Sequence, residues 1–173
     1  MKVKNQEILV KFNEVKTPYE LDEILYQFHK IMNQLNNSYY LKESEDPLIY
    51  FIEYSNPEEL INKLKNNNEI TTIVPVTCVL SNLNYIIATI SKKIRHKITH
   101  KDTLNVKCYM ENYDKNRTIK LKNEIITKLK ESIGLPIDTV DPMWTINIFI
   151  IGEITAINIT RSKKNRNKFS DYN

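Results

Sequence analysis

Glycine is scarce in this chain, which has only Gly134 and Gly152 among its 173 residues. Phosphate cradles and dinucleotide-binding turns need glycine where backbone amides crowd a phosphate. The chain contains no glycine-rich loop of that kind. The sequence therefore disfavours an enzyme that depends on a nucleotide or on coenzyme A, and no cofactor is expected.

Cysteine and long apolar runs are scarce as well. Cys78 and Cys108 each lie in an apolar, strand-like stretch, so a disulfide framework is not expected. No apolar run approaches the roughly 20 residues of a membrane-spanning helix. The amino terminus lacks the apolar core of a signal peptide. We expect a folded, soluble protein of the cytoplasm with no membrane partner.

Metal binding and catalysis are the next functions to weigh. His96 and His100 are four residues apart, but the two cysteines are isolated and predicted to face the core, so ordinary core cysteines are favoured over a zinc site. The acidic groups at 43–46 and 58–59 lie in loop or helix-start positions, where carboxylates favour helix starts. We expect no catalytic residue, no metal and no enzyme activity.

Charge is distributed unevenly along the chain. Residues 1–70 carry 8 lysines and 12 acids, whereas residues 71–173 carry 17 Lys or Arg and 9 acids. The second part also contains all four arginines, Arg95, Arg117, Arg161 and Arg166. A polyanionic partner would therefore be held chiefly by the carboxyl-terminal half.

The first part of the chain predicts strands that alternate with helices. Thr17, Pro18 and Glu20 form a capping residue, a first-turn proline and an acid three residues past the cap, which together predict a helix start. The stretch from 36 to 47 has loop chemistry around a short segment that the pattern leaves unassigned. The predicted elements are a strand over 7–13, a helix over 18–35, a strand over 48–54, a shorter helix from Pro57 and a strand over 70–76. This order indicates a small α+β layer of ferredoxin-like type.

The second part repeats this style. Apolar residues predict a helix over 82–98 with a basic outer face, and strict alternation predicts a strand over 103–110. A polar, basic turn is predicted over 113–118, followed by a helix over 119–133 that Gly134 ends. Two final strands flank Gly152, which suits a tight hairpin of the II′ type. The tail from Arg161 onward is polar and basic.

These landmarks, taken in order, resemble a THUMP domain, the RNA-binding module of thiouridine synthases, tRNA methyltransferases and a tRNA cytidine-acetylation adaptor. Ile-Val-Pro-Val at 73–76 matches the entering strand, and the amphipathic helix over 82–98 follows. Thr-Leu-Asn-Val at 103–106 resembles the Thr-Phe-x-Val strand, Arg117 falls where the family places an arginine, and 140–146 resembles the closing signature.

The resemblance implies a mixed α+β and α/β architecture in three parts. Residues 1–69 resemble the ferredoxin-like domain that precedes a THUMP domain, residues 70–163 form the THUMP domain, and 164–173 form a basic tail. The implied partner is tRNA, bound at its acceptor end. No catalytic domain is evident, so the resemblance is closest to the adaptor branch, which binds tRNA for a separate modifying enzyme, an acetyltransferase in that branch.

Cations and one aromatic side chain are the candidate RNA-binding residues, because cations neutralise phosphates and a ring can stack on an unpaired base. A solvated surface in a Lys-rich chain is the alternative. Two other functions stay open: an RNA-modification transferase in its own right, and a protein-interaction module without RNA binding. The candidate residues are Arg95, Lys97, Lys107, Tyr109, Arg117, Lys120, Lys122, Arg161, Lys163, Lys164, Arg166 and Lys168.

Overall fold

The structure is a computed structural model that describes residues 6–110 and 115–162. It divides into two compact units between Thr77 and Cys78. The boundary expected from the sequence lies between 69 and 70. The two boundaries differ because the residues of strand β4 (Ile70–Leu80) from Ile70 to Val76 pair with the first strand of the chain. These residues therefore belong to the first unit.

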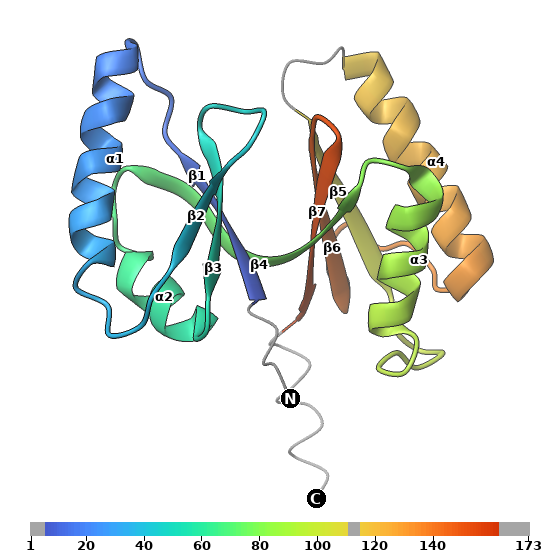
Figure 1. Cartoon of the computed structure of the whole chain (residues 1–173). Helices are drawn as coiled ribbons and strands as arrows, with labels where there is room; N and C mark the ends of the chain where they lie inside the picture. Colours follow the sequence, from blue (N-terminus) through green and yellow to red (C-terminus); the bar gives the residue numbers. More distant parts are fainter. Residues whose placement is uncertain (1–5, 111–114, 163–173) are drawn as a thin grey trace, which may run out of the picture. The chain divides into compact units, whose positions relative to one another are not determined.

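The first unit has the ferredoxin-like order of elements. Strand β1 (Gln6–Phe12) is followed by α1 (Pro18–Met32), β2 (Tyr40–Glu43), β3 (Ile49–Tyr54), α2 (Pro57–Leu64) and then β4. The strands pair in the order β2-β3-β1-β4, and every pairing is antiparallel. Helices α1 and α2 cover one face of this sheet (Figure 1), where Phe28 and Leu60 pack against Ile8 and Ile52. This is the split β-α-β arrangement.

Strand β2 is an element that the sequence pattern left unassigned. It has only four residues and none of them is buried, so the sequence shows almost no alternation of buried and exposed residues there. Polar contacts hold it in register, because Lys42 Nζ lies 2.7 Å from Glu7 Oε1 and also pairs with Glu53. Helix α1 begins as predicted, with Thr17 Oγ1 accepting from the Glu20 amide at 3.3 Å. It ends at Met32, three residues before the predicted end.

In the second unit, two helices pack on one face of a sheet formed by three strands (Figure 1). Its elements are α3 (Leu83–Ile94), β5 (Leu104–Met110), α4 (Lys115–Ile133), β6 (Trp144–Ile151) and β7 (Ile154–Arg161). Strands β5 and β6 are parallel, with α4 as the crossover between them, and β6 and β7 form an antiparallel hairpin. The core lies between helices and sheet, where Ile90 and Leu129 meet Val106 and Ile146.

The predicted basic turn over 113–118 is wrong from Lys115 onward. Helix α4 begins at Lys115, so the residues from Lys115 to Thr118 are helical. Residues 113 and 114 lie outside the described residues. The first turn of α4 is largely exposed and polar, so it carries none of the apolar spacing by which the sequence located this helix.

Gly152 turns the final hairpin. It has a φ of +59°, a left-handed conformation that glycine adopts without a steric penalty and that primed hairpin turns require. The hairpin pairs Trp144 at one end with Arg161. The predicted strand–turn–strand is therefore confirmed, as is the mixed α/β class of the chain.

Candidate nucleic-acid interface

The helix layers of the two units carry opposite charge. Helices α1 and α2 contain five acids and two lysines. Helices α3 and α4 contain eight Lys or Arg and two glutamates. Because the inner faces of α3 and α4 are packed with isoleucine and leucine, their cations lie toward solvent. The second unit therefore presents a basic helical surface.

Helix α3 places its cations at its carboxyl-terminal end. Asn82 caps the other end, with its side-chain oxygen accepting from the amide of Asn84 at 2.9 Å. Ile90 and Ile94 are buried, and the charged residues that follow them are exposed. Positive charge is favourable there because carbonyl groups are left unpaired at a helix carboxyl terminus. The exposed residues of this end are Lys92, Lys93, Arg95, His96 and Lys97.

Helix α4 carries three of the candidate cations, and they do not share one face of the helix. Arg117 and Lys120 are exposed. Lys122 lies about 140° around the helix from Arg117, from about 100° per residue, and is only half-exposed. It lies close enough to Cys108 to lower that thiol's pKa, although burial is the larger effect and raises the pKa to about 11. Lys122 therefore faces the β5 side of α4.

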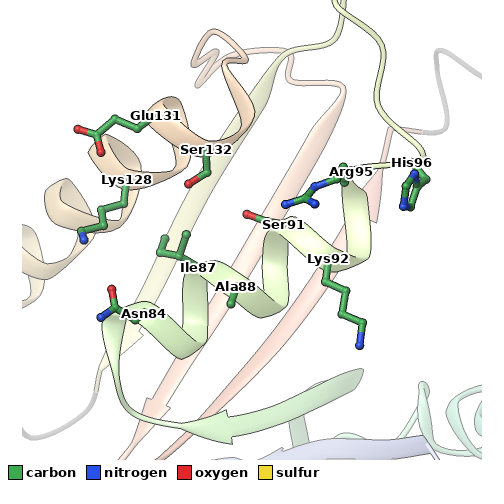
Figure 2. Close-up of a pocket in the computed structure, with 10 residues that line it drawn as sticks. All are labelled: Asn84, Ile87, Ala88, Ser91, Lys92, Arg95, His96, Lys128, Glu131 and Ser132. Atoms are coloured by element: carbon green, nitrogen blue, oxygen red, sulfur yellow. The ribbon is translucent and has the colours of Figure 1, made fainter.

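A groove of about 580 Å³ runs between α3 and α4 (Figure 2). Small side chains help to make it, because Ser91 on α3 points toward Ser132 on α4 and Ala88 also lines the groove. Its cations are Lys92 and Arg95 on α3 and Lys128 on α4. The remaining lining residues are Asn84, Ile87, His96 and Glu131.

The Ser91 hydroxyl is the unusual group of this groove. Ser91 is 5% exposed, and among the described residues its Oγ has no hydrogen-bond partner. In Figure 2 the guanidinium of Arg95 points back along α3 toward Ser91. No ion pair with a described residue engages Lys92, Arg95 or Lys128. A donor and several cations thus line one concave surface.

Lys107 and Tyr109 lie on the other face of the second unit's sheet. They alternate with Val106 and Cys108, whose side chains belong to the core beneath the helices. The Tyr109 ring is 45% exposed and stacks on Phe149 with centroids 4.8 Å apart and planes at 13°. The candidate residues Lys107 and Tyr109 therefore lie on a different face of the unit from the candidate cations of α4.

Arg161 is engaged within the fold. Its guanidinium lies over the Trp144 ring, 5.5 Å from the centroid, and the Trp144 Nε1 donates to Asp102 Oδ2 at 2.9 Å. Burial favours protonation of Asp102, but hydrogen bonds from Trp144 and Thr99, together with the charge of Arg161, hold the pKa of its carboxyl below the ordinary value. Trp144 is 6% exposed and belongs to the core of the second unit.

The remaining predicted residues fall into two groups. Lys97 is exposed just beyond the end of α3. Lys163, Lys164, Arg166 and Lys168 lie outside the described residues. The RNA-binding assignment of every candidate residue stays a prediction.

The described part of the chain shows neither a metal-binding cluster nor a helix that could span a membrane. No group of three or more His, Cys, Asp or Glu side chains is arranged there to hold a metal ion. None of the helices within residues 6–110 and 115–162 has the length and apolar character needed to cross a membrane.

Sequence reasoning did not select Ser91, Lys92 and Lys128 as site residues. The signal was present in α3, where Ala88 and Ser91 are three residues apart on one side of a helix that is otherwise rich in isoleucine. Such a pair of small residues leaves room beside a neighbouring helix. The position of α4 was needed to show that cations surround that room.

The two-unit arrangement, a ferredoxin-like unit followed by a THUMP-like unit, is a fold that solved structures share. PH1313 from Pyrococcus horikoshii matches with a TM-score of 0.69 and 15% identity over 90% of this chain. A 4-thiouridine synthetase solved in complex with RNA and ATP matches with a TM-score of 0.58 and 14% identity over 91% of this chain. TrmN from Thermus thermophilus matches with a TM-score of 0.50 and 12% identity over 90%.

This chain spans about half the length of those structures, covering 54% of PH1313, 42% of the 4-thiouridine synthetase and 46% of TrmN. No protein-family model and no curated protein matches it. At these identities the likeness establishes the fold, and function must be argued from the site.

Proposed function

We propose that this chain binds tRNA at its acceptor end and acts as a non-catalytic adaptor for a separate tRNA-modifying enzyme. The observation that carries this proposal is the charge contrast between the helix layers, with eight cations and two acids on α3 and α4. Fold similarity to a synthetase that was solved with RNA supports the same partner class. A cytidine acetyltransferase is the enzyme partner that we propose, from the family resemblance.

The proposed mechanism is electrostatic attachment followed by recognition of unpaired nucleotides. Cations such as Arg117 and Lys120 neutralise phosphates and release counterions. Side chains do not reach the bases in the deep groove of an RNA helix, so selectivity comes from shape and from single-stranded ends. Tyr109, with its ring held against Phe149, is the exposed ring on which an unpaired base would stack.

We favour the adaptor role over catalysis by this chain because the sequence lacks a loop for a nucleotide cofactor. With only two glycines, it has no loop in which backbone amides could cradle a nucleotide cofactor. The enzyme alternative, a transferase in its own right, requires transfer of a group to tRNA by this chain alone. The adaptor role requires instead that the chain raise the modification rate of a second enzyme when tRNA is limiting.

A protein-interaction module is the second candidate, and an observation on α1 favours it. Tyr19 and Tyr26 are 76% and 60% exposed, and Glu20, Asp22 and Glu23 lie on the same helix. Exposed tyrosines among acids suit a protein partner better than a polyanion. This surface is compatible with the adaptor role, in which an enzyme must also be bound.

The test compares two double variants that each remove two positive charges. Arg117→Ala with Lys120→Ala changes α4, and Lys63→Ala with Lys65→Ala is the matched control in the first unit. We expect the α4 variant to weaken tRNA binding several-fold and to reduce the slope of log affinity against log salt by roughly 0.7 to 0.9 per lost phosphate contact. Equal effects of the two variants would show that the charge of the helix layer does not determine binding.

A further inference from the structure

The groove between α3 and α4 is an opening in an otherwise packed helix pair. On the inner faces of the same helices, Ile90, Ile125 and Leu129 are fully buried and join the core. At the groove, the lining residues Ala88, Ser91 and Ser132 have small side chains, and in Figure 2 the Ser91 side chain points toward Ser132. The volume of about 580 Å³ falls within the range of small-molecule sites, about 300–1,000 Å³.

The unpaired hydroxyl of Ser91 points to a polar occupant. Buried hydroxyls normally find a partner, and a serine inside a helix commonly donates to the carbonyl four residues earlier. Ser91 makes no such bond with any described residue, although it is 5% exposed. Leaving a buried hydroxyl unpaired is unfavourable for folding. A ligand that accepts a hydrogen bond from Ser91 would remove this penalty.

The charges around Ser91 define the ligand as an anion. Lys92 and Arg95 on α3 and Lys128 on α4 line the groove, and Glu131 is the one carboxylate among its lining residues. In Figure 2 the Glu131 side chain points away from Arg95, toward the outer side of α4. The Arg95 guanidinium points toward Ser91 from the next turn of α3. Guanidinium and hydroxyl donors together suit the oxygens of a phosphate.

We propose that the groove between α3 and α4 binds a phosphate group of an RNA strand, with Ser91 and Arg95 as donors and Lys92 and Lys128 as the surrounding charge. The phosphate site is argued from the groove itself, whereas RNA as the source of the phosphate rests on the proposed function. The Ser91 hydroxyl donates to one phosphate oxygen, and the Arg95 guanidinium donates to others. The remainder of the groove accommodates the attached nucleotide.

The experiment uses the full chain with two probes and three variants. Inorganic pyrophosphate is titrated into isotope-labelled protein at constant ionic strength while the amide resonances of α3 and α4 are followed. A five-nucleotide single-stranded RNA is titrated by fluorescence anisotropy. Ser91→Ala removes the donor and Ala88→Leu fills the groove. Thr127→Ala is the matched control, because its hydroxyl already donates to the Asn123 carbonyl at 2.9 Å.

The expected result is that pyrophosphate changes the amide chemical shifts only of the residues around Ser91 and Arg95. Ser91→Ala should weaken both probes by about tenfold or more, from the strength of a hydrogen bond to a charged group. Ala88→Leu should abolish the shifts, and Thr127→Ala should change neither. Thermal melting of each variant confirms that it is folded. Pyrophosphate shifts spread over all lysines, or Ser91→Ala binding equal to wild type, would overturn the phosphate site.

The two proposals fail in distinguishable ways. If the wild type binds RNA while Ser91→Ala and Ala88→Leu bind it equally well, the groove proposal is overturned and RNA binding stands. If the wild type binds pyrophosphate in the groove but no RNA, the phosphate site stands and RNA as its source is overturned together with the proposed function.

Discussion

The Trp144 indole and the Asp102 carboxylate form a buried hydrogen bond of 2.9 Å that joins the loop before β5 to the start of β6. Asp102 also accepts from the amide and the hydroxyl of Thr99, each at 3.0 Å. Arg161, on the strand paired with β6, lies over the same indole. This cluster therefore links the loop before β5 to the start of β6 and to the end of β7, the three strands of the second unit's sheet.

Replacing Asp102 with Asn should destabilise the fold by about 1 to 3 kcal/mol, because a hydrogen bond to a charged, buried acceptor is lost or weakened. Trp144 is the only tryptophan of the chain, so urea unfolding followed by its fluorescence measures this loss directly. Asp141→Asn, an exposed position on the preceding loop, is the control and should leave the unfolding midpoint unchanged. Equal midpoints for Asp102→Asn and wild type would contradict this role.

The pH dependence of the same variant has a definite sign. The pKa of Asp102 is lower in the folded chain than its ordinary value of 3.8, so the fold stabilises the ionised form. Its contribution is complete above the unfolded pKa and is lost as pH falls through the folded pKa. The stability difference between wild type and Asp102→Asn should stay constant from about pH 7 to about pH 5 and shrink below about pH 4. A difference that grows on acidification would refute this assignment.

Ser91→Ala should leave the fold as stable as wild type or make it more stable by up to about 1 kcal/mol, because it removes a buried hydroxyl that has no described partner. Ile90→Ala, the neighbouring core position, should cost about 2 to 5 kcal/mol by leaving a cavity. Urea unfolding compares the two. A strongly destabilised Ser91→Ala would mean that the hydroxyl stabilises the fold, which argues against its role as a ligand donor.

Glu131→Gln should increase RNA affinity about two- to threefold at low salt, because it removes the one carboxylate that lines the groove. The gain should diminish as salt is raised. Glu58→Gln, an exposed acid at the start of α2, changes the net charge equally and should have a smaller effect. Anisotropy titrations at two salt concentrations distinguish a local effect from one of overall charge.

Tyr109→Ala should weaken binding of single-stranded RNA about fivefold or more, since stacking of a base on an aromatic ring contributes about 1 to 3 kcal/mol. Tyr109→Phe keeps the ring and should bind like wild type. Tyr19→Ala, an exposed tyrosine of the first unit, serves as the control for loss of an aromatic surface. Equal affinities for Tyr109→Ala and Tyr109→Phe would show that the ring does not stack on RNA.

The predictable parts of the fold are those with strong local signals. Thr17 and Pro18 fixed the start of α1, and the alternation from Leu104 to Met110 located β5, because capping and periodicity are properties of neighbouring residues. Strand β2 was missed because its register depends on Lys42 contacting Glu7, which is 35 residues away. The first turn of α4 was missed because it buries almost nothing.

The candidate site was predictable only as a charge distribution. The sequence located the excess of cations in the second part of the chain, but alternation and helical spacing cannot show which elements face each other. Lys107 and Arg117 are both candidate RNA-binding residues, yet β5 and α4 place them on opposite faces of the unit. The groove forms because Ser91 and Ser132 line the same space, and this depends on how α3 packs against α4.

The most direct test of the account is a titration of the full chain with total tRNA, and with tRNA trimmed of its single-stranded 3′ end, over a series of salt concentrations. We predict tight binding of intact tRNA that weakens steeply with salt, and clearly weaker binding of trimmed tRNA at every concentration. Weak binding that is the same for intact and trimmed tRNA would contradict the proposal that this chain recognises the acceptor end of tRNA.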